Sequence, residues 1–243
     1  MATGKEKRDS RFLHIVLSAG IHASNFLHHL IPGPHAPKKV FPLIEAIKRG
    51  DIEEVRALLA QGANPNERET QVVERKWLRT SVLDLPKEWA KTALMQAVMS
   101  GKKEIVELLL DSGAEVDTGD VHGSTALACT GNVEIAKLLI DRGADVNVRA
   151  FEPVLTAAAM EQRIDLMRLF LDNGADINAT DSEGFTALME PAGSGYMDVV
   201  ETLLAAGIDV NVRNNEGFTA QHYAKENKQK GIVDMLVRAG AHE

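Results

Sequence analysis

Histidine is the residue most suited to metal or acid–base chemistry here, and five of the eight histidines precede residue 40. His22 and His29 are seven residues apart, so on a helix their imidazoles share one face and make a transition-metal site conceivable. No cysteine lies nearby, and the acidic residues of this stretch, Glu6 and Asp9, come before the apolar pattern. The other interpretation places these histidines on the wet edge of an amphipathic helix. We favour it, and expect no metal and no other cofactor.

Cys129 is the single cysteine of the chain, and His122 is close enough in sequence to suggest a thiol nucleophile. Such a nucleophile needs a base and a third group that orients the base, and no third group is apparent. The stretches "GKK" at 101–103 and "GSG" at 193–195 lack the spacing of a phosphate-binding loop. We therefore expect no catalytic residues and no enzyme. A metal-dependent enzyme that uses the N-terminal histidines is the alternative.

Charge is distributed unevenly along the chain, whose formal net charge is −8. Residues 1–40 carry six Lys/Arg against two Asp/Glu, a net +4, so residues 41–243 carry −12. An acidic body argues against a nucleic-acid partner and favours a partner with a basic face. No apolar run reaches 18 residues, so we expect no membrane span. Two histidines interrupt the one candidate export signal, "FLHIVLSAGIHA", and a lone cysteine suits a reducing compartment, which favours the cytoplasm.

Both tryptophans of the chain stand in one short stretch, "RKWLRTSVLDLPKEWAK", residues 75–91. Tryptophan and arginine are the residues most enriched at interface hot spots, so Arg75, Trp77, Arg79 and Trp89 are candidate partner contacts. The alternative is that the tryptophans fold this stretch back onto its neighbours. Both interpretations remain open, and both can hold for different tryptophans.

Six regularly placed glycines divide the rest of the chain into units. They are Gly62, Gly113, Gly143, Gly174, Gly207 and Gly240, separated by 51, 30, 31, 33 and 33 residues. Each ends a short run with apolar residues at helical spacing, such as "IVELLLDSGA", where the glycine suits a left-handed helix end. An earlier short helix precedes each run, clearest in "KTALMQAVMSG", and pieces such as "ADVNV" with turns such as "DSEG" follow it.

The stretches "KTALMQAVMSGKKEIVELLLDSGAEVD", "FTALMEPAGSGYMDVVETLLAAGIDVN" and "FTAQHYAKENKQKGIVDMLVRAGA" resemble ankyrin repeats. The resemblance covers residues 41–243 and implies an all-α solenoid of helix-turn-helix units with β-hairpin fingers. Stacked repeats share a continuous core, which explains how a chain poor in aromatic residues folds. The boundaries we expect are an N-terminal segment at 1–40, an insertion at 67–90, and repeats at 41–66, 91–123, 124–152, 153–185, 186–218 and 219–243.

Several features depart from a regular array. The first interval is 18 residues too long, which is the insertion, and repeat three loses three residues from its inner helix. Pro191 falls in the inner helix of repeat five, where a proline is expected to cost about 3 kcal/mol. Sequence drift and a shaped groove explain the changes in repeats three and five equally well. Residues 10–31 show an amphipathic pattern and are expected to cap the array, with a partner-binding or membrane-surface helix as the alternative. The cap is expected to cover the apolar face of repeat one, which includes Leu43, Ile44, Ile47, Val55 and Leu58.

The resemblance implies a non-enzymatic module that binds, inhibits or scaffolds another protein through its fingers and inner helices. A membrane-surface adaptor, anchored by the N-terminal helix, is a further alternative. The partner is expected to present an apolar patch flanked by basic groups, and the free protein to be monomeric. Phe185 and Phe218 are expected to be exposed at the bases of their fingers, where apolar side chains commonly mark an interaction site. The alternative is that each phenylalanine packs on its neighbouring hairpin. Besides the four residues of the insertion, the candidate contacts are Met99, His122, Met160, Glu183, Phe185, Glu216 and Phe218.

Overall fold

The computed structural model describes residues 41–69, 91–120, 123–148 and 152–242, all within one compact unit formed by residues 41–72 and 83–243. The predicted helix at 10–31 and most of the insertion lie outside the described residues. The helices are α3 (Pro42–Arg49), α4 (Ile52–Ala60), α5 (Ala93–Met99), α6 (Lys103–Asp111), α7 (Val133–Asp141), α8 (Val154–Met160), α9 (Ile164–Asp172), α10 (Met189–Ser194), α11 (Met197–Ala205), α12 (Ala220–Glu226) and α13 (Lys230–Arg238).

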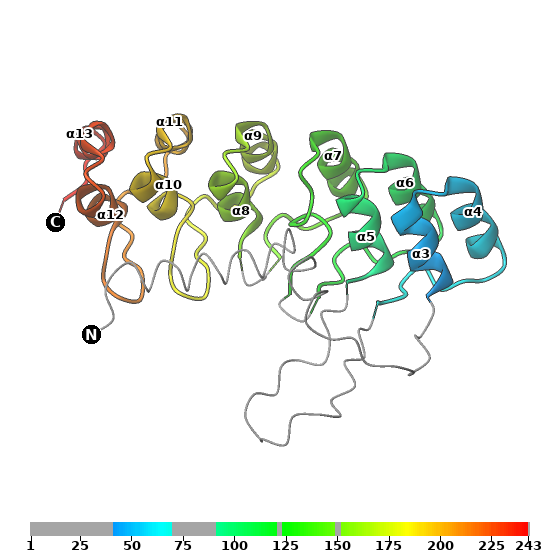
Figure 1. Ribbon diagram of the computed structural model, residues 1–243. Helices are drawn as coiled ribbons and strands as arrows, with labels where there is room; N and C mark the ends of the chain where they lie inside the picture. Colours follow the sequence, from blue (N-terminus) through cyan, green and yellow to red (C-terminus); the bar gives the residue numbers. More distant parts are fainter. Residues whose placement is uncertain (1–40, 70–90, 121–122, 149–151, 243) are drawn as a thin grey trace, which may run out of the picture. The chain divides into compact units, whose positions relative to one another are not determined.

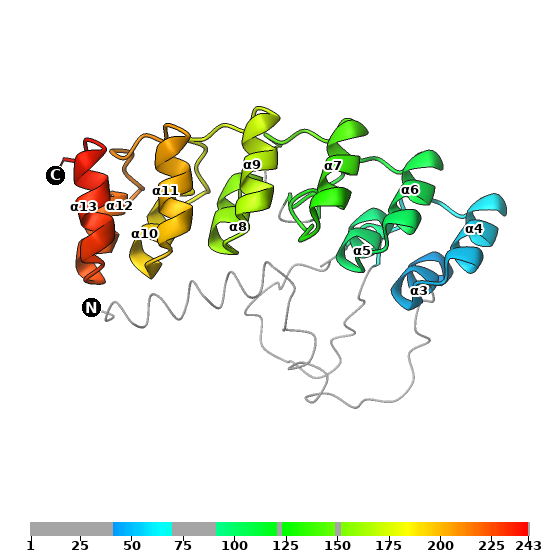
Figure 2. The ribbon, with the colours of Figure 1, turned by 90° about the horizontal axis from the view of Figure 1, so that it is seen from above.

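These helices form two rows within the unit (Figures 1 and 2). The inner row contains α3, α5, α8, α10 and α12, and the outer row contains α4, α6, α7, α9, α11 and α13. Where a repeat has two helices, they pack on each other, and helices also pack on a neighbour in the same row, as α10 does on α11 and α12. Extended structure in the described residues is limited to isolated pairings such as Thr180 with Thr186. The all-α solenoid expected from the sequence is therefore confirmed.

Local sequence signals set the ends of these helices. The Thr92 hydroxyl oxygen accepts a hydrogen bond from the Met95 N–H at 3.1 Å and caps the start of α5. At the end of α6, Gly113 has a φ of +89°, a left-handed conformation that glycine adopts without strain. The next N–H, of Ala114, reaches back to the Leu109 carbonyl at 2.9 Å and closes the helix end.

The core is aliphatic and runs from repeat to repeat. Leu94, Leu109, Leu139 and Leu155 are fully buried between the rows, and Phe170 is the largest of the fully buried side chains. Each such side chain contributes about 1.5–3 kcal/mol when it leaves water. A single repeat cannot bury its apolar face alone, so this stabilisation depends on the stack.

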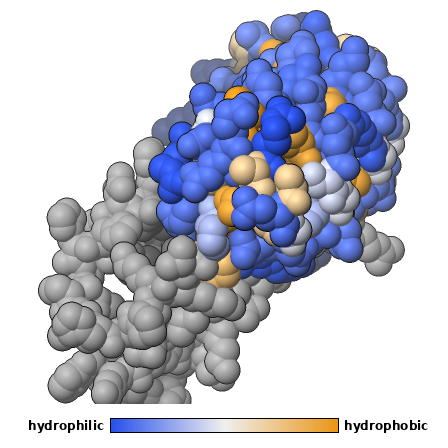
Figure 3. All heavy atoms as spheres, turned by 90° about the vertical axis from the view of Figure 1, so that its right-hand side faces the viewer, coloured by the Kyte–Doolittle hydropathy of each residue, from blue (hydrophilic) through white to orange (hydrophobic). Residues whose placement is uncertain are grey.

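Repeat one presents few apolar side chains at its surface. Leu43, Ile44, Ile47 and Val55, which the predicted capping helix was expected to cover, are buried. Seen from the repeat-one side, apolar groups reach the surface in small patches between hydrophilic side chains (Figure 3). Leu58, from the same predicted apolar face, is partly buried against the core.

Asparagine side chains connect successive repeats four residues after Gly62, Gly143, Gly174 and Gly207. Asn147 donates from Nδ2 to the Gly174 carbonyl at 2.9 Å and accepts at Oδ1 from the Asp176 N–H at 2.8 Å. Asn66 and Asn211 make the same pair of bonds to the repeat that follows each of them. The asparagine is therefore an inter-repeat bridge as well as a turn residue, because its amide both donates and accepts.

Repeat three has lost its inner helix rather than one turn of it. Residues 126–129 form a single turn, closed by the Cys129 N–H donating to the Thr125 carbonyl at 3.2 Å, and the described part of this repeat contains only α7. Thr125 stands where Thr92 caps α5, but its buried hydroxyl has no hydrogen-bond partner. Three residues are nearly one turn of a short helix, so their loss leaves too few residues for the helix to form.

Pro191 does not break α10, and the expected cost of about 3 kcal/mol is wrong. It is the third residue of α10, where the backbone N–H has no intrahelical partner in any case. Compared with α5 and α12, the helix begins two residues later, after a tight turn in which the Met189 N–H donates to the Thr186 carbonyl at 3.2 Å. The proline thus shortens the helix at its start and removes no bond from its interior.

Candidate protein-interaction surface

Two fingers of the array have the same hydrogen-bonded turn, and each finger is counted with the repeat whose inner helix follows it. In finger 5 (residues 180–186), the Asp181 N–H donates to the Phe185 carbonyl at 3.0 Å. The Asp181 carboxylate accepts from the Glu183 and Phe185 N–H groups at 2.9 and 2.8 Å. Asn214 makes the corresponding three bonds in finger 6 (residues 213–219), at 3.0, 3.1 and 2.9 Å. A short polar side chain thus fixes each tip, which leaves Glu183 and Glu216 exposed.

The tips of fingers 5 and 6 also contact each other. The Asn215 N–H donates to the Glu183 carbonyl at 3.0 Å, and Asn215 Nδ2 donates to the Ser182 carbonyl at 3.0 Å. Gly184 has a φ of +81°, and a Cβ placed there would lie 2.8 Å from Asn215 Oδ1 and 2.9 Å from Asn215 N. We call the four exposed tip residues, Ser182, Glu183, Asn215 and Glu216, the finger ridge. Its register is set by bonds between repeats rather than by either finger alone.

The expectation that Phe185 is exposed at the base of its finger is wrong. Only 7 % of Phe185 is exposed, because its ring packs on Tyr223 of the next repeat with the ring centroids 5.4 Å apart. Phe218, one repeat later, is half-buried, with its ring stacked on His222 at 4.0 Å. The two phenylalanines hold equivalent positions but have different neighbours. Phe185 is therefore a packing residue, and Phe218 remains partly exposed.

The two predicted methionines lie at the last residue of their inner helices. Met99 ends α5 and is 40 % exposed, with its Sδ 3.1 Å from the Lys91 ammonium nitrogen. Met160 ends α8 and is half-buried. These helices belong to repeats two and four, on either side of the repeat that lacks an inner helix. The remaining predicted contacts lie outside the described residues: Arg75, Trp77, Arg79, Trp89 and His122.

Two observations bear on nucleophilic and metal chemistry, the state of the Cys129 thiol and the grouping of possible metal ligands. Burial raises the pKa of the Cys129 thiol to about 11, against the opposing effect of Lys91 and with smaller contributions from Asp120 and Glu161. The thiol is therefore protonated at neutral pH, which makes it a poor nucleophile. Across the ranges that the structure describes, no three His, Cys, Asp or Glu side chains gather into a set that could hold a metal ion. No helix in those ranges is long and apolar enough to cross a membrane.

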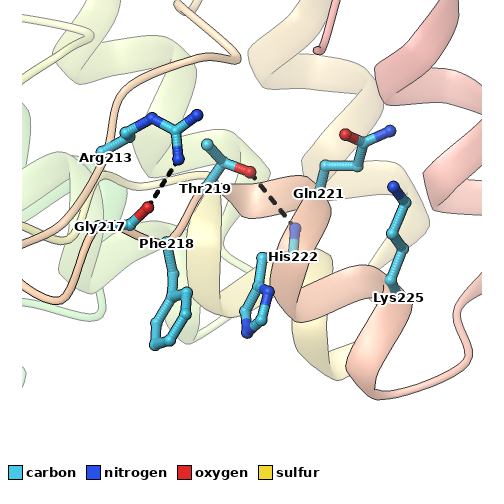
Figure 4. A pocket seen from close by; sticks show the side chains of 7 residues that line it. All are labelled: Arg213, Gly217, Phe218, Thr219, Gln221, His222 and Lys225. Carbon is cyan, nitrogen blue, oxygen red and sulfur yellow. Dashed lines mark hydrogen bonds between the residues drawn. The ribbon is translucent and has the colours of Figure 1, made fainter. Parts of the chain in front are cut away.

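Repeat six contains a small pocket that the sequence interpretation missed. The pocket residues come from finger 6 and from α12 with its capping residue Thr219, and Figure 4 shows Arg213 at one side and Lys225 at the other. A charge signal for it was present in the sequence. Residues 213–243 carry five Lys/Arg against four Asp/Glu, a net charge of +1. Since residues 41–243 together carry −12, residues 41–212 carry −13. The lining consists of Arg213, Gly217, Phe218, Thr219, Gln221, His222 and Lys225.

Comparison with known proteins agrees with this architecture. Residues 76–150 and 155–243 match the family model described as ankyrin repeats (3 copies), and residues 40–70 match the model of a single ankyrin repeat. No curated protein matches the chain in sequence. Among solved structures, the chain is similar to the ankyrin repeat domain of Bcl-3, described as a unique member of the IkappaB protein family. The TM-score is 0.68 at 26 % identity, and the match covers 84 % of this chain and 88 % of that one. The chain belongs to the ankyrin repeat family.

Proposed function

We propose that the chain is a non-enzymatic module that binds another protein through the finger ridge and the exposed ends of the inner helices. The observation that carries the proposal is the bond pair from Asn215 to finger 5, which holds two exposed tips in one register. A surface already ordered before binding loses little conformational entropy when a partner docks. Ankyrin repeats are built for protein interaction, so the family supports the class of function.

Charge and apolar area indicate what kind of partner fits. Glu183 and Glu216 project from adjacent tips, and both are exposed. Basic groups on the partner would meet them at the rim, where charge mainly sets the association rate and the orientation. Met99 offers an adaptable apolar contact at the inner-helix end. The partner we propose therefore presents an apolar patch flanked by Lys or Arg.

The test compares charge reversal on the ridge with charge reversal elsewhere in the same two repeats. The ridge variant is Glu183→Lys with Glu216→Lys, and the control is Glu201→Lys with Asp234→Lys, both exposed positions on outer helices α11 and α13. A partner captured by the wild-type chain and then purified serves as the ligand in stopped-flow binding.

We expect the ridge variant to associate at least tenfold more slowly at low salt, with a weaker salt dependence, while the control stays within twofold of the wild type. Equal association rates for the two variants would place the binding surface elsewhere. Circular dichroism of both variants checks that the repeats remain folded.

A further inference from the structure

We infer that the pocket in repeat six, the repeat-six pocket, is a docking site for an acidic segment of a partner protein, with a carboxylate held between Arg213 and Lys225. The inference rests on the proposed function because its occupant belongs to a bound protein. The pocket would give the partner a second contact, basic where the finger ridge is acidic.

The size of the pocket limits what can occupy it. Its volume is about 200 Å³, below the roughly 300–1,000 Å³ of sites that take cofactors or drug-sized ligands. One protein side chain and its neighbouring backbone fill such a space. The pocket therefore suits a single residue of a partner better than a free metabolite.

The groups that line the pocket select an anion. Arg213 and Lys225 lie on opposite sides of it, and among the described residues that line it there is no Asp or Glu (Figure 4). Arg213 donates from one guanidinium nitrogen to the Gly217 carbonyl at 2.8 Å, which fixes the side chain across the base of finger 6. A guanidinium has five N–H groups, so others remain to form charge-assisted bonds to a carboxylate.

An aromatic wall favours an organic carboxylate over a small inorganic anion. The rings of Phe218 and His222 are 4.0 Å apart and nearly parallel, with an interplanar angle of 8°. Tyr223 lies edge-on to both rings, with centroid distances of 6.1 Å to Phe218 and 5.7 Å to His222, and its hydroxyl accepts a hydrogen bond from Asn214 Nδ2 at 2.8 Å. This flat surface can cover the methylene groups of Asp or Glu, or an aromatic residue beside them.

The charge of the surrounding array makes the pocket selective. Residues 41–212 carry −13, whereas residues 213–243 carry +1. An acidic segment is repelled along most of the array and attracted at its last repeat. Such a contrast fixes where the segment docks, because specificity requires unfavourable alternatives as well as a favourable site.

The experiment uses the full chain and two labelled peptides with blocked ends, Glu-Asp-Phe-Asp-Glu and its amide counterpart Gln-Asn-Phe-Asn-Gln. Fluorescence anisotropy measures affinity for the wild type, for Arg213→Gln with Lys225→Gln, and for the control Lys230→Gln with Arg238→Gln. The control removes the same two charges from exposed positions of repeat six that do not line the pocket. Thermal melting shows whether each variant is folded.

We expect the wild type to bind the acidic peptide at least tenfold more tightly than the amide peptide. The pocket variant should bind the acidic peptide at least fivefold more weakly than the wild type does, and the control variant should bind it within twofold of the wild type. In the wild type, the acidic peptide should shift the ring proton signals of Phe218 and His222, a readout that does not depend on any variant. Equal affinity for the two peptides, equal weakening in both variants, or unshifted ring signals would overturn the inference. Full displacement of the peptide by equimolar inorganic phosphate would also overturn it, because the site would then recognise a simple anion.

The two proposals fail in different ways. Glu183→Lys should leave binding of the acidic peptide within twofold of the wild type, since Glu183 does not line the pocket. Loss of partner binding in the ridge variant, together with no peptide binding in the wild type, would overturn the repeat-six inference and leave the proposed function intact.

Discussion

The inter-repeat bridge is made by asparagine in the described repeats except at one position, and that exception gives a sharp prediction. In repeat two, Asp117 takes the place of the asparagine and accepts from the Asp145 N–H at 3.1 and 3.2 Å from its two oxygens. A carboxylate cannot donate, so the bond that Asn147 makes to the Gly174 carbonyl has no counterpart at Gly143. Asp117→Asn should restore it.

The magnitude follows from one added hydrogen bond. A bond between neutral groups in a partly buried position contributes about 0.5–1.5 kcal/mol to stability. Removing the repulsion between the Asp117 and Asp145 carboxylates adds to this in the same direction. We expect Asp117→Asn to stabilise the folded chain by about 1 kcal/mol, which corresponds to a rise of about 2–4 °C in Tm for a chain of this size.

The gain should depend on pH. Burial raises the pKa of Asp117, the hydrogen bond from the Asp145 N–H lowers it, and the Asp145 carboxylate raises it. A pKa higher in the folded than in the unfolded state gives stability that is present below about pH 4 and is lost as pH rises through the folded pKa. Wild-type protein therefore lacks this contribution at neutral pH. The advantage of Asp117→Asn should be largest near pH 7 and smaller near pH 4.5, which urea unfolding followed by circular dichroism measures.

The reverse substitutions serve as matched controls. Asn147→Asp removes a donor bonded at 2.9 Å, whereas Asn178 only accepts, from the Asp209 N–H at 2.9 Å. Asn147→Asp should therefore destabilise the chain by about 1 kcal/mol more than Asn178→Asp. Destabilisation by Asp117→Asn at neutral pH, or equal costs for the two reverse changes, would refute the bridge as the explanation.

The remaining predictions concern the fingers and the thiol. Gly184→Ala should destabilise the chain by at least about 1 kcal/mol more than Gly217→Ala in urea unfolding, because both glycines are left-handed but a Cβ meets Asn215 only at Gly184. Phe185→Ala should cost about 3 kcal/mol and Phe218→Ala about 1 kcal/mol, in line with their burial, and equal costs would contradict the assigned packing. Cys129 should react with iodoacetamide at pH 7.5 about tenfold more slowly than a model thiol. Its thiolate fraction is about a hundredfold lower than that of the model thiol, but a thiolate of higher pKa is more nucleophilic, which offsets part of the loss in rate. A rate equal to that of the model thiol would show that the pKa is not raised.

The fold was predictable because its signals are local. A left-handed glycine after each apolar run and a capping threonine such as Thr92 act within a few residues, and they repeat at a nearly fixed interval. The loss of helix in repeat three was visible as three missing residues. The position of Pro191 was also visible, but its effect depended on where α10 begins, which the proline itself shifts by two residues.

The site was less predictable because it depends on contacts between repeats. Phe185 and Phe218 stand in the same local pattern, yet Phe185 is covered by Tyr223 of the following repeat. The bond from Asn215 to finger 5 likewise joins residues 32 positions apart. The repeat-six pocket could have been suspected from the local charge balance, although its aromatic wall depends on how Phe218 and His222 stack.

The most direct test of the central claim is site-specific photo-crosslinking from the full chain to its bound partner. A benzophenone side chain would replace Glu183, Glu216 or Met99 on the proposed surface, and Glu201 or Asp234 on the outer helices as controls. We predict that the same partner is crosslinked from all three proposed positions and from neither control. Crosslinking to that partner with equal yield from the outer helices, or from the controls alone, would contradict binding through the finger ridge and the inner-helix ends.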